Sequence, residues 1–243
     1  MSNVPEVRVI SIGAMSAHPL RGERPGLRTG HATTTLVSVG DRRILIDPGL
    51  PAPAVIARLE ERTGLTPAQI THVFLTSFHP ETRRGLEAFE QAEWLIAERE
   101  RETVGVPIAE SLRRLGESAR AADAAGEDLH EDQRTMLQVL ERDAAILHRC
   151  RPAPDSLAPG VDLFPLPGVT PGLTGVLIPR PLGDVLICGD AIPTIEHLEQ
   201  GKAPKHAADV AQARESLAEA VEIADLLVLG RDNMVVNPTK RPF

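Results

Sequence analysis

Apolar residues along the chain follow two spacings, one typical of buried strands and one typical of amphipathic helices. Short apolar runs bounded by Gly, Pro or Asp predict strands, because a buried strand offers side chains to both faces of its sheet. Strands and helices that alternate along the chain predict an α/β fold. The predicted strands cover residues 7–12, 34–39, 43–47, 71–76, 93–97, 162–165, 173–179, 184–188 and 226–229.

Apolar positions three and four residues apart predict helices at 53–63 and 209–225. A longer stretch, 98–151, alternates charges of both signs and repeats apolar residues at helical spacing. Small residues at 119–128 are expected to connect two helices there. We therefore expect one domain, 1–243, with a helical insertion at about 98–151 that covers the site or forms a homodimer surface.

The strand predicted at 71–76 ends in a polar loop that carries Ser77, His79 and Glu81. Open α/β sheets present their chemistry just past the carboxyl ends of strands. This loop is therefore the centre of the candidate site.

Four segments resemble, in order, the motifs of the metallo-β-lactamase superfamily. Leu-Thr-Ser-Phe-His-Pro-Glu-Thr-Arg-Arg-Gly at 75–85 resembles the first metal motif, Leu-Thr-His-x-His-x-Asp-His followed by Gly. Pro-Gly-Val-Thr-Pro-Gly at 167–172, Gly-Asp at 189–190 and Gly-Arg-Asp at 230–232 resemble the later motifs. The resemblance spans about 7–233 and implies a four-layer αββα sandwich.

Most positions that hold metal ligands in that family carry other residues here. Only His79 and Asp190 are unchanged, and Glu81 is a third potential ligand. A zinc hydrolase needs three or four donors per ion and one open position, and neither valine nor a guanidinium offers a lone pair. A two-zinc site, and any other cofactor, is therefore expected to be absent. The seven positions read Ser77, His79, Glu81, Thr82, Val169, Asp190 and Arg231.

Two acidic side chains without a metal need another cation, because a buried unpaired carboxylate is costly. Arg231 stands where the resemblance places a ligand histidine, and its guanidinium can fork onto carboxylates. Asp47 matches an aspartate that, by the resemblance, supports the metal loop through hydrogen bonds. The candidate pocket residues are His79, Glu81, Asp190, Arg231, Asp232, Ser77 and Asp47.

Three functions follow from these residues. The first is a small-molecule-binding or regulatory module of this fold without the dinuclear zinc chemistry. The alternative is a hydrolase of ester, thioester or amide bonds that holds one Zn, Fe or Mn ion on His79, Glu81 and Asp190, since oxygen-rich sites favour the harder metals. The third is a structural subunit that assembles through the helical insertion.

Composition narrows the partners and the compartment. A net charge of −8 and 2% aromatic residues argue against nucleic acid, which needs positive charge and stacking rings. Cys150 and Cys188 are too few for a disulfide scaffold. No apolar run is long enough to span a membrane, and Glu6 and Arg8 stand where a signal peptide would be apolar, so we expect a cytoplasmic protein.

The remaining histidines are open questions for the site. His18 and His31 lie in a predicted loop, and such histidines are usually solvated. The sequence leaves undecided whether His31, His130, His148 or His197 reach the pocket.

Overall fold

Two six-stranded sheets form the centre of the computed structural model, which describes residues 4–24, 26, 28–125 and 130–240. The strand order of the first sheet is β1 (Glu6–Ser11), β2 (Thr34–Val39), β3 (Arg42–Ile46), β4 (His72–Leu75), β5 (Glu93–Ile96) and β6 (Arg151–Pro152). The order of the second is β12 (Met234–Val236), β11 (Leu226–Val228), β10 (Val185–Ile187), β9 (Thr174–Ile178), β8 (Val161–Pro165) and β7 (Ser156–Ala158).

Both sheets are mixed, and their parallel strands end where the candidate site begins. In the first sheet β3, β4, β5 and β6 run parallel, whereas β1, β2 and β3 pair antiparallel. In the second sheet only β10 and β11 pair parallel. A parallel pair needs a crossover, which α1 (Ala52–Thr63) supplies between β3 and β4 and α6 (Val210–Ile223) between β10 and β11.

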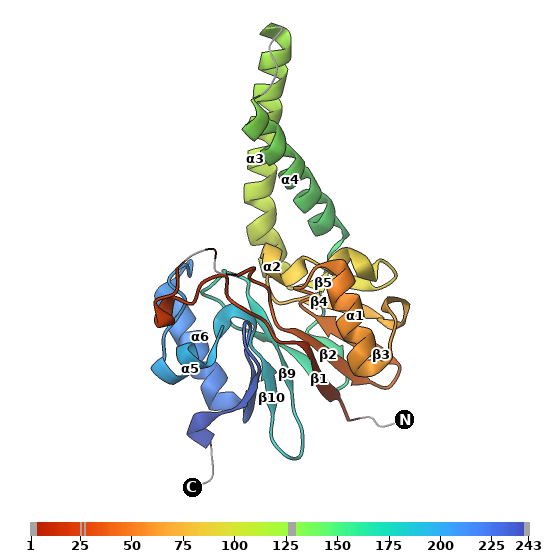
Figure 1. Ribbon diagram of the computed structural model, residues 1–243, viewed down its shortest axis with the longest axis vertical. Helices are drawn as coiled ribbons and strands as arrows, with labels where there is room; N and C mark the ends of the chain where they lie inside the picture. Colours follow the sequence, from red (N-terminus) through yellow and green to blue (C-terminus); the bar gives the residue numbers. More distant parts are fainter. Residues whose placement is uncertain (1–3, 25, 27, 126–129, 241–243) are drawn as a thin grey trace.

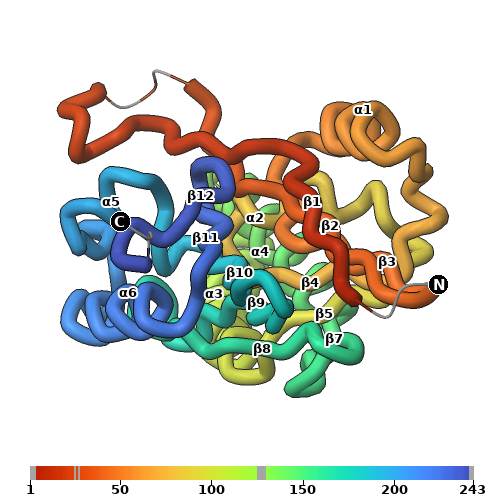
Figure 2. Tube along the Cα trace, turned by 90° about the horizontal axis from the view of Figure 1, so that it is seen from below, coloured from red at the N-terminus to blue at the C-terminus, as the bar shows by residue number. Residues whose placement is uncertain are grey.

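The sheets pack face to face, and helices cover their outer faces (Figure 2). Side chains along β4 alternate between two cores, as the two-residue period of a strand requires. Phe74 lies in the core between the sheets, whereas Val73 and Leu75 lie in the core under α1. The second sheet packs its outer face against α6. This is the αββα sandwich that the motif order implied.

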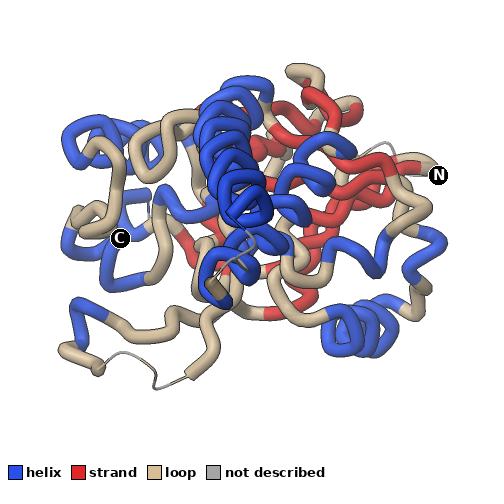
Figure 3. Tube along the Cα trace, turned by 90° about the horizontal axis from the view of Figure 1, so that it is seen from above, coloured by secondary structure: helices blue, strands red, loops and turns tan. Residues whose placement is uncertain are grey.

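Two long helices, α3 (Glu98–Ala125) and α4 (Glu131–Arg149), form a hairpin that projects from the sheets (Figure 1; Figure 3 looks down on it). The predicted connection at 119–128 was placed too early, because alanine-rich segments favour helix and α3 continues to Ala125. Residues 126–129 lie outside the described part of the chain. No described helix is long and apolar enough to cross a membrane.

The hairpin exposes three large apolar side chains, Val106, Met136 and Val139. The homodimer expected through this insertion stays a prediction. An ion pair joins the base of the hairpin to the rest of the domain. Arg83, on the short helix α2 (Pro80–Arg83), donates to Asp143 of α4 at 2.7 Å.

Short elements account for most other differences from the sequence predictions. Strands β6, β7 and β12 were not predicted. The helix α5 (Ile195–Gln200) was not predicted either. These four segments are short and stand outside any longer apolar pattern, so periodicity did not reveal them.

Candidate functional site

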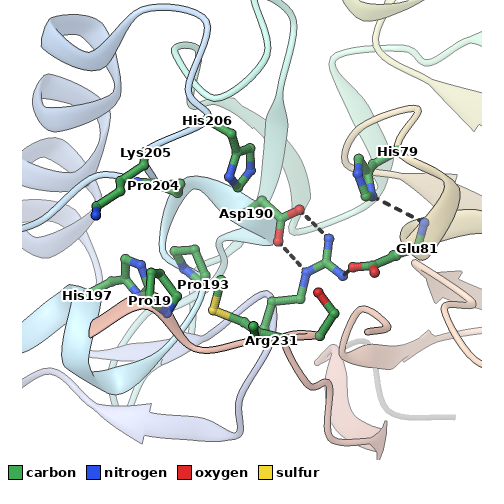
Figure 4. A pocket seen from close by; sticks show the side chains of 13 residues that line it. Pro19, His79, Glu81, Asp190, Pro193, His197, Pro204, Lys205, His206 and Arg231 are labelled. Atoms are coloured by element: carbon green, nitrogen blue, oxygen red, sulfur yellow. Dashed lines mark hydrogen bonds and ion pairs between the residues drawn. The ribbon is translucent and has the colours of Figure 1, made fainter. Parts of the chain in front are cut away.

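A pocket of about 500 Å³ lies where the ends of three strands from both sheets meet (Figure 4). His79 and Glu81 follow β4, Asp190 follows β10, and Arg231 follows β11. Segments that are far apart in the sequence thus contribute to one cavity, with the loop before β2 as a further wall.

Arg231 joins the two acidic side chains at the floor of this pocket. Its Nε donates to Asp190 Oδ1 at 2.7 Å and its Nη2 to Asp190 Oδ2 at 2.6 Å, a two-point ion pair. Its Nη1 donates to Glu81. Burial would raise the pKa of Asp190, but the charge and hydrogen bonds of Arg231 outweigh it and lower that pKa. The guanidinium therefore neutralises a buried cluster of acids.

Asp47 supports the start of the loop that carries His79. Thr76 donates to Asp47 through its backbone N–H at 2.9 Å and its hydroxyl at 2.6 Å. Asp47 has a φ of 49°, a conformation that Asp and Asn tolerate better than most residues. Burial raises the pKa of Asp47 to about 7, against the opposing effect of these two hydrogen bonds.

Replacing Asp47 by asparagine should make the free energy of unfolding less dependent on pH. Because the folded-state pKa of Asp47 lies above the unfolded value of about 3.9, the native protein binds a proton at Asp47 between these two pKa values and the unfolded protein does not. The contribution of Asp47 to stability is therefore lost as pH rises from about 4 to about 7, on the order of 1 kcal/mol per pKa unit. Asp47→Asn keeps the shape and an acceptor for the Thr76 N–H, while its NH2 group can donate to the Thr76 hydroxyl oxygen instead of accepting from it.

Urea unfolding at several pH values checks this. Relative to the wild type, Asp47→Asn should gain stability as pH rises from about 4 to about 7. A difference that does not change with pH would contradict the assignment.

Several side chains around Arg231 carry no imidazole, thiolate or carboxylate that could hold a zinc ion. Val169 is buried in the apolar core beside α6, and the Thr82 hydroxyl lies 2.8 Å from the carbonyl oxygen of Ser77. Asp190 already accepts two hydrogen bonds from a buried cation. Among the described residues, no three His, Cys, Asp or Glu side chains gather as a metal ion would need.

Some predicted site residues lie away from the cavity wall. Ser77 and Asp47 are buried behind it, and Asp232 accepts from the backbone N–H of Ile195. His79 is exposed at the rim, where partial burial and then the charge of Arg231 lower its pKa.

The undecided histidines separate clearly in the structure. His197 lines the pocket, as does His206, which sequence reasoning had not selected. His31 contacts backbone oxygens of the loop before β2, His130 precedes α4, and His148 lines a different cavity on the hairpin. None of these last three lines the pocket.

The sequence analysis did not predict a buried polar cluster that lies beside the pocket. His18 is 3% exposed rather than solvated, and its Nε2 lies 3.0 Å from both Thr194 Oγ1 and Glu196 Oε2. Arg21 donates to Glu196 from the other side at 2.7 Å. The only sequence signal was Thr194, a residue type favoured at helix starts, directly before α5.

Glu100 was also missed, although it connects three parts of the site. This side chain is 1% exposed on the first turn of α3. It accepts the Phe78 N–H at 2.9 Å and the Thr170 hydroxyl at 2.6 Å. The hairpin, the loop after β4 and the Pro-Gly turn are thereby held together. A glutamate in a highly charged helix gave no sign of this role.

Comparisons with known proteins agree with this architecture. The family model described as metallo-beta-lactamase superfamily matches residues 27–230. No curated protein matches the chain. A Thermotoga maritima structure assigned to the metallo-beta-lactamases is 19% identical, with a TM-score of 0.65, and the alignment covers 96% of this chain and 99% of that one.

Two further solved structures are similar in fold, the first of them a quorum-quenching lactonase. The dizinc lactonase AidC, solved with the product N-hexanoyl-L-homoserine, is 18% identical with a TM-score of 0.59, over 90% of this chain and 80% of that one. A mutant of AiiA of B. thuringiensis, solved with N-decanoyl-L-homoserine bound at the active site, is 18% identical with a TM-score of 0.61, over 96% of this chain and 94% of that one. At these identities the likeness concerns the fold alone.

Proposed function

Because this chain belongs to the metallo-beta-lactamase superfamily, we propose that it binds a small molecule in the pocket of that fold without a dinuclear zinc centre. The proposal makes it a binding or regulatory module whose cation at the pocket floor is Arg231. One observation carries it, the clamping of Arg231 between Asp190 and Glu81.

A guanidinium and a divalent cation compete for the same two carboxylates. Arg231 is 7% exposed, so a metal that displaced it would leave a buried positive charge next to the ion. Breaking one partner out of a buried ion pair costs about 3–5 kcal/mol. Besides His79, the other ligand positions of the resemblance offer the metal little, since Ser77, Thr82 and Val169 carry neither imidazole nor carboxylate. The pair therefore favours an arginine-filled site.

The pocket keeps the properties of a ligand site. Its volume of about 500 Å³ lies in the range of small-molecule pockets, roughly 300–1,000 Å³. Apolar side chains form much of its wall, and a few polar groups converge on it. Met15, Ala17, Pro19, Pro193 and Pro204 supply the apolar part.

The second candidate is a metal-dependent hydrolase with one ion on His79, Glu81 and Asp190. The similar fold of a dizinc lactonase favours it, as does the lowered pKa of His79, which keeps the imidazole neutral near pH 7. In that case an ester, thioester or amide would be the substrate.

Metal analysis separates the two functions. Protein purified without chelator should contain far less than one Zn, Fe or Mn per chain, and His79→Ala should not change that content. Stoichiometric metal in the wild type that His79→Ala removes would support the hydrolase and contradict the binding module.

Thermal unfolding with added zinc tests the competition directly. We expect Arg231→Ala to gain a zinc-dependent rise in melting temperature that the wild type lacks, because both carboxylates become free. The double variant Arg231→Ala/Asp190→Asn is the matched control and should lose this gain. A wild type stabilised by zinc as strongly as Arg231→Ala would contradict the competition.

A further inference from the structure

One histidine on the pocket wall is not part of the Arg231 cluster. His197 lies on α5 beside Pro19 and Pro193, on the opposite side of the pocket from His79 (Figure 4). Only 1% of its surface is exposed, so its polar atoms need defined partners. Its ring is held in place by its Nδ1 contact with Thr194 at 2.9 Å.

The Thr194 hydroxyl determines which nitrogen of His197 carries hydrogen. Its Oγ1 lies 2.8 Å from Glu196 Oε2 as well as 2.9 Å from His197 Nδ1. Burial would raise the pKa of Glu196, but hydrogen bonds from Arg21 and then Thr194 lower it to about 2. An ionised carboxylate only accepts hydrogen bonds, so the single hydroxyl hydrogen points to Glu196. Thr194 can then only accept from His197, whose Nδ1 is the donor.

The other ring nitrogen is consequently an acceptor. Burial, followed by the charge of His18, lowers the pKa of His197 to about 4, so the ring is neutral near pH 7. A neutral ring with hydrogen on Nδ1 has its lone pair on Nε2. Within the described residues Nε2 has no hydrogen-bond partner. It is not among the polar atoms that are both fully buried and unpartnered. Because His197 lines the pocket, this unpaired nitrogen is the ring atom left for a ligand there.

We propose that His197 Nε2 is the specificity-determining acceptor of this pocket and selects small molecules that carry a hydroxyl or N–H group on an apolar body. This inference rests on the proposed binding function and adds the chemical class of the ligand. A site built to hydrogen-bond a donor disfavours an analogue that lacks it, because the protein's acceptor is then buried unpaired. Lys205 also lines the pocket and has no acidic partner among the described residues, so it can meet an anionic end of the ligand.

The tautomer can be measured without any ligand. Nitrogen NMR of protein with isotope-labelled histidine distinguishes hydrogen on Nδ1 from hydrogen on Nε2. We expect His197 to carry its hydrogen on Nδ1, the less populated tautomer of the free side chain, and Thr194→Val to release that preference. Hydrogen on Nε2 in the wild type would overturn the proposal.

Two acids that differ only in a hydroxyl test the selectivity, 3-hydroxyoctanoate and octanoate. Calorimetric titration of the wild type should show about three- to tenfold tighter binding of the hydroxy acid. This is the difference in affinity that one neutral hydrogen bond contributes. His197→Phe keeps a ring of similar size without the acceptor and should bind both acids equally. His148→Phe, the same change in the separate hairpin cavity, should leave the preference intact.

The outcomes distinguish this inference from the proposed function. Equal binding of both acids by the wild type overturns the role of His197 and leaves the binding function standing. Binding of neither acid overturns the ligand class, while metal analysis still decides between binding module and hydrolase. If His197→Phe does not fold, the ratio in the wild type and the tautomer decide alone.

Discussion

Arg231→Ala should lower the free energy of unfolding by about 3–5 kcal/mol near pH 7, because it leaves Asp190 buried without its cation. The lowered pKa of Asp190 means that its stabilising contribution exists above the unfolded pKa of about 3.9 and is lost as pH falls through the folded pKa. The loss in Arg231→Ala should therefore shrink in acid. Urea unfolding at neutral and acidic pH measures both effects.

An exposed arginine provides the matched control for this change. Arg113 pairs with Glu117 one turn along α3, and both side chains are more than half exposed. Such pairs contribute about 0.3–0.5 kcal/mol, so Arg113→Ala should alter stability little. Arg231→Lys should fall between the two, because an ammonium cannot fork onto a carboxylate. Equal losses in Arg231→Ala and Arg113→Ala would contradict a buried pair.

Gly172→Ala should be strongly destabilising. A methyl group on Gly172 would lie 2.1 Å from Glu100 N and 2.3 Å from Glu100 Cα, in the first turn of α3. That turn cannot shift without breaking the Glu100 bonds to Phe78 and Thr170. We expect a loss of about 3 kcal/mol or more, measured by urea unfolding or as a lower yield of folded protein.

Gly116→Ala on the same helix is the control with the opposite sign. The nearest heavy atom to its added methyl group is Arg120 Nη2 at 3.9 Å, so nothing clashes. Alanine is preferred to glycine in a helix by about 1 kcal/mol, and this variant should be more stable than the wild type. A cost below about 1 kcal/mol for Gly172→Ala would mean that α3 packs less closely on the turn than the structure has it.

The sequence predicted the elements with a clear apolar pattern, short central strands included, and missed the edge strands β6, β7 and β12. Helix 209–225 and strand 71–76 correspond to α6 and β4 with small differences at the ends. Both have a strong hydrophobic period and clear stop signals. By contrast, β6 and β12 owe their existence to pairing with β5 and β11. Hydrogen bonds to a distant neighbour leave no pattern in the segment itself.

The candidate site divides in the same way. The order of the motifs selected four candidate residues, and the structure places them around one pocket: His79, Glu81, Asp190 and Arg231. Glu100 and the Thr194 cluster gave no comparable signal. Their importance comes from burial and from partners that lie on other elements.

What the sequence determined by itself is the order of strands, helices and motifs, and hence the fold. Hydrophobic period and turn residues act over a few neighbours, so they can be read locally. The sequence proposed Arg231 as the cation for the two carboxylates, whereas only the tertiary structure decided which atoms meet and that Thr194 turns His197 into an acceptor. Charge pairing and tautomer choice depend on distances of about 3 Å between residues remote in the chain, and folding alone sets those distances.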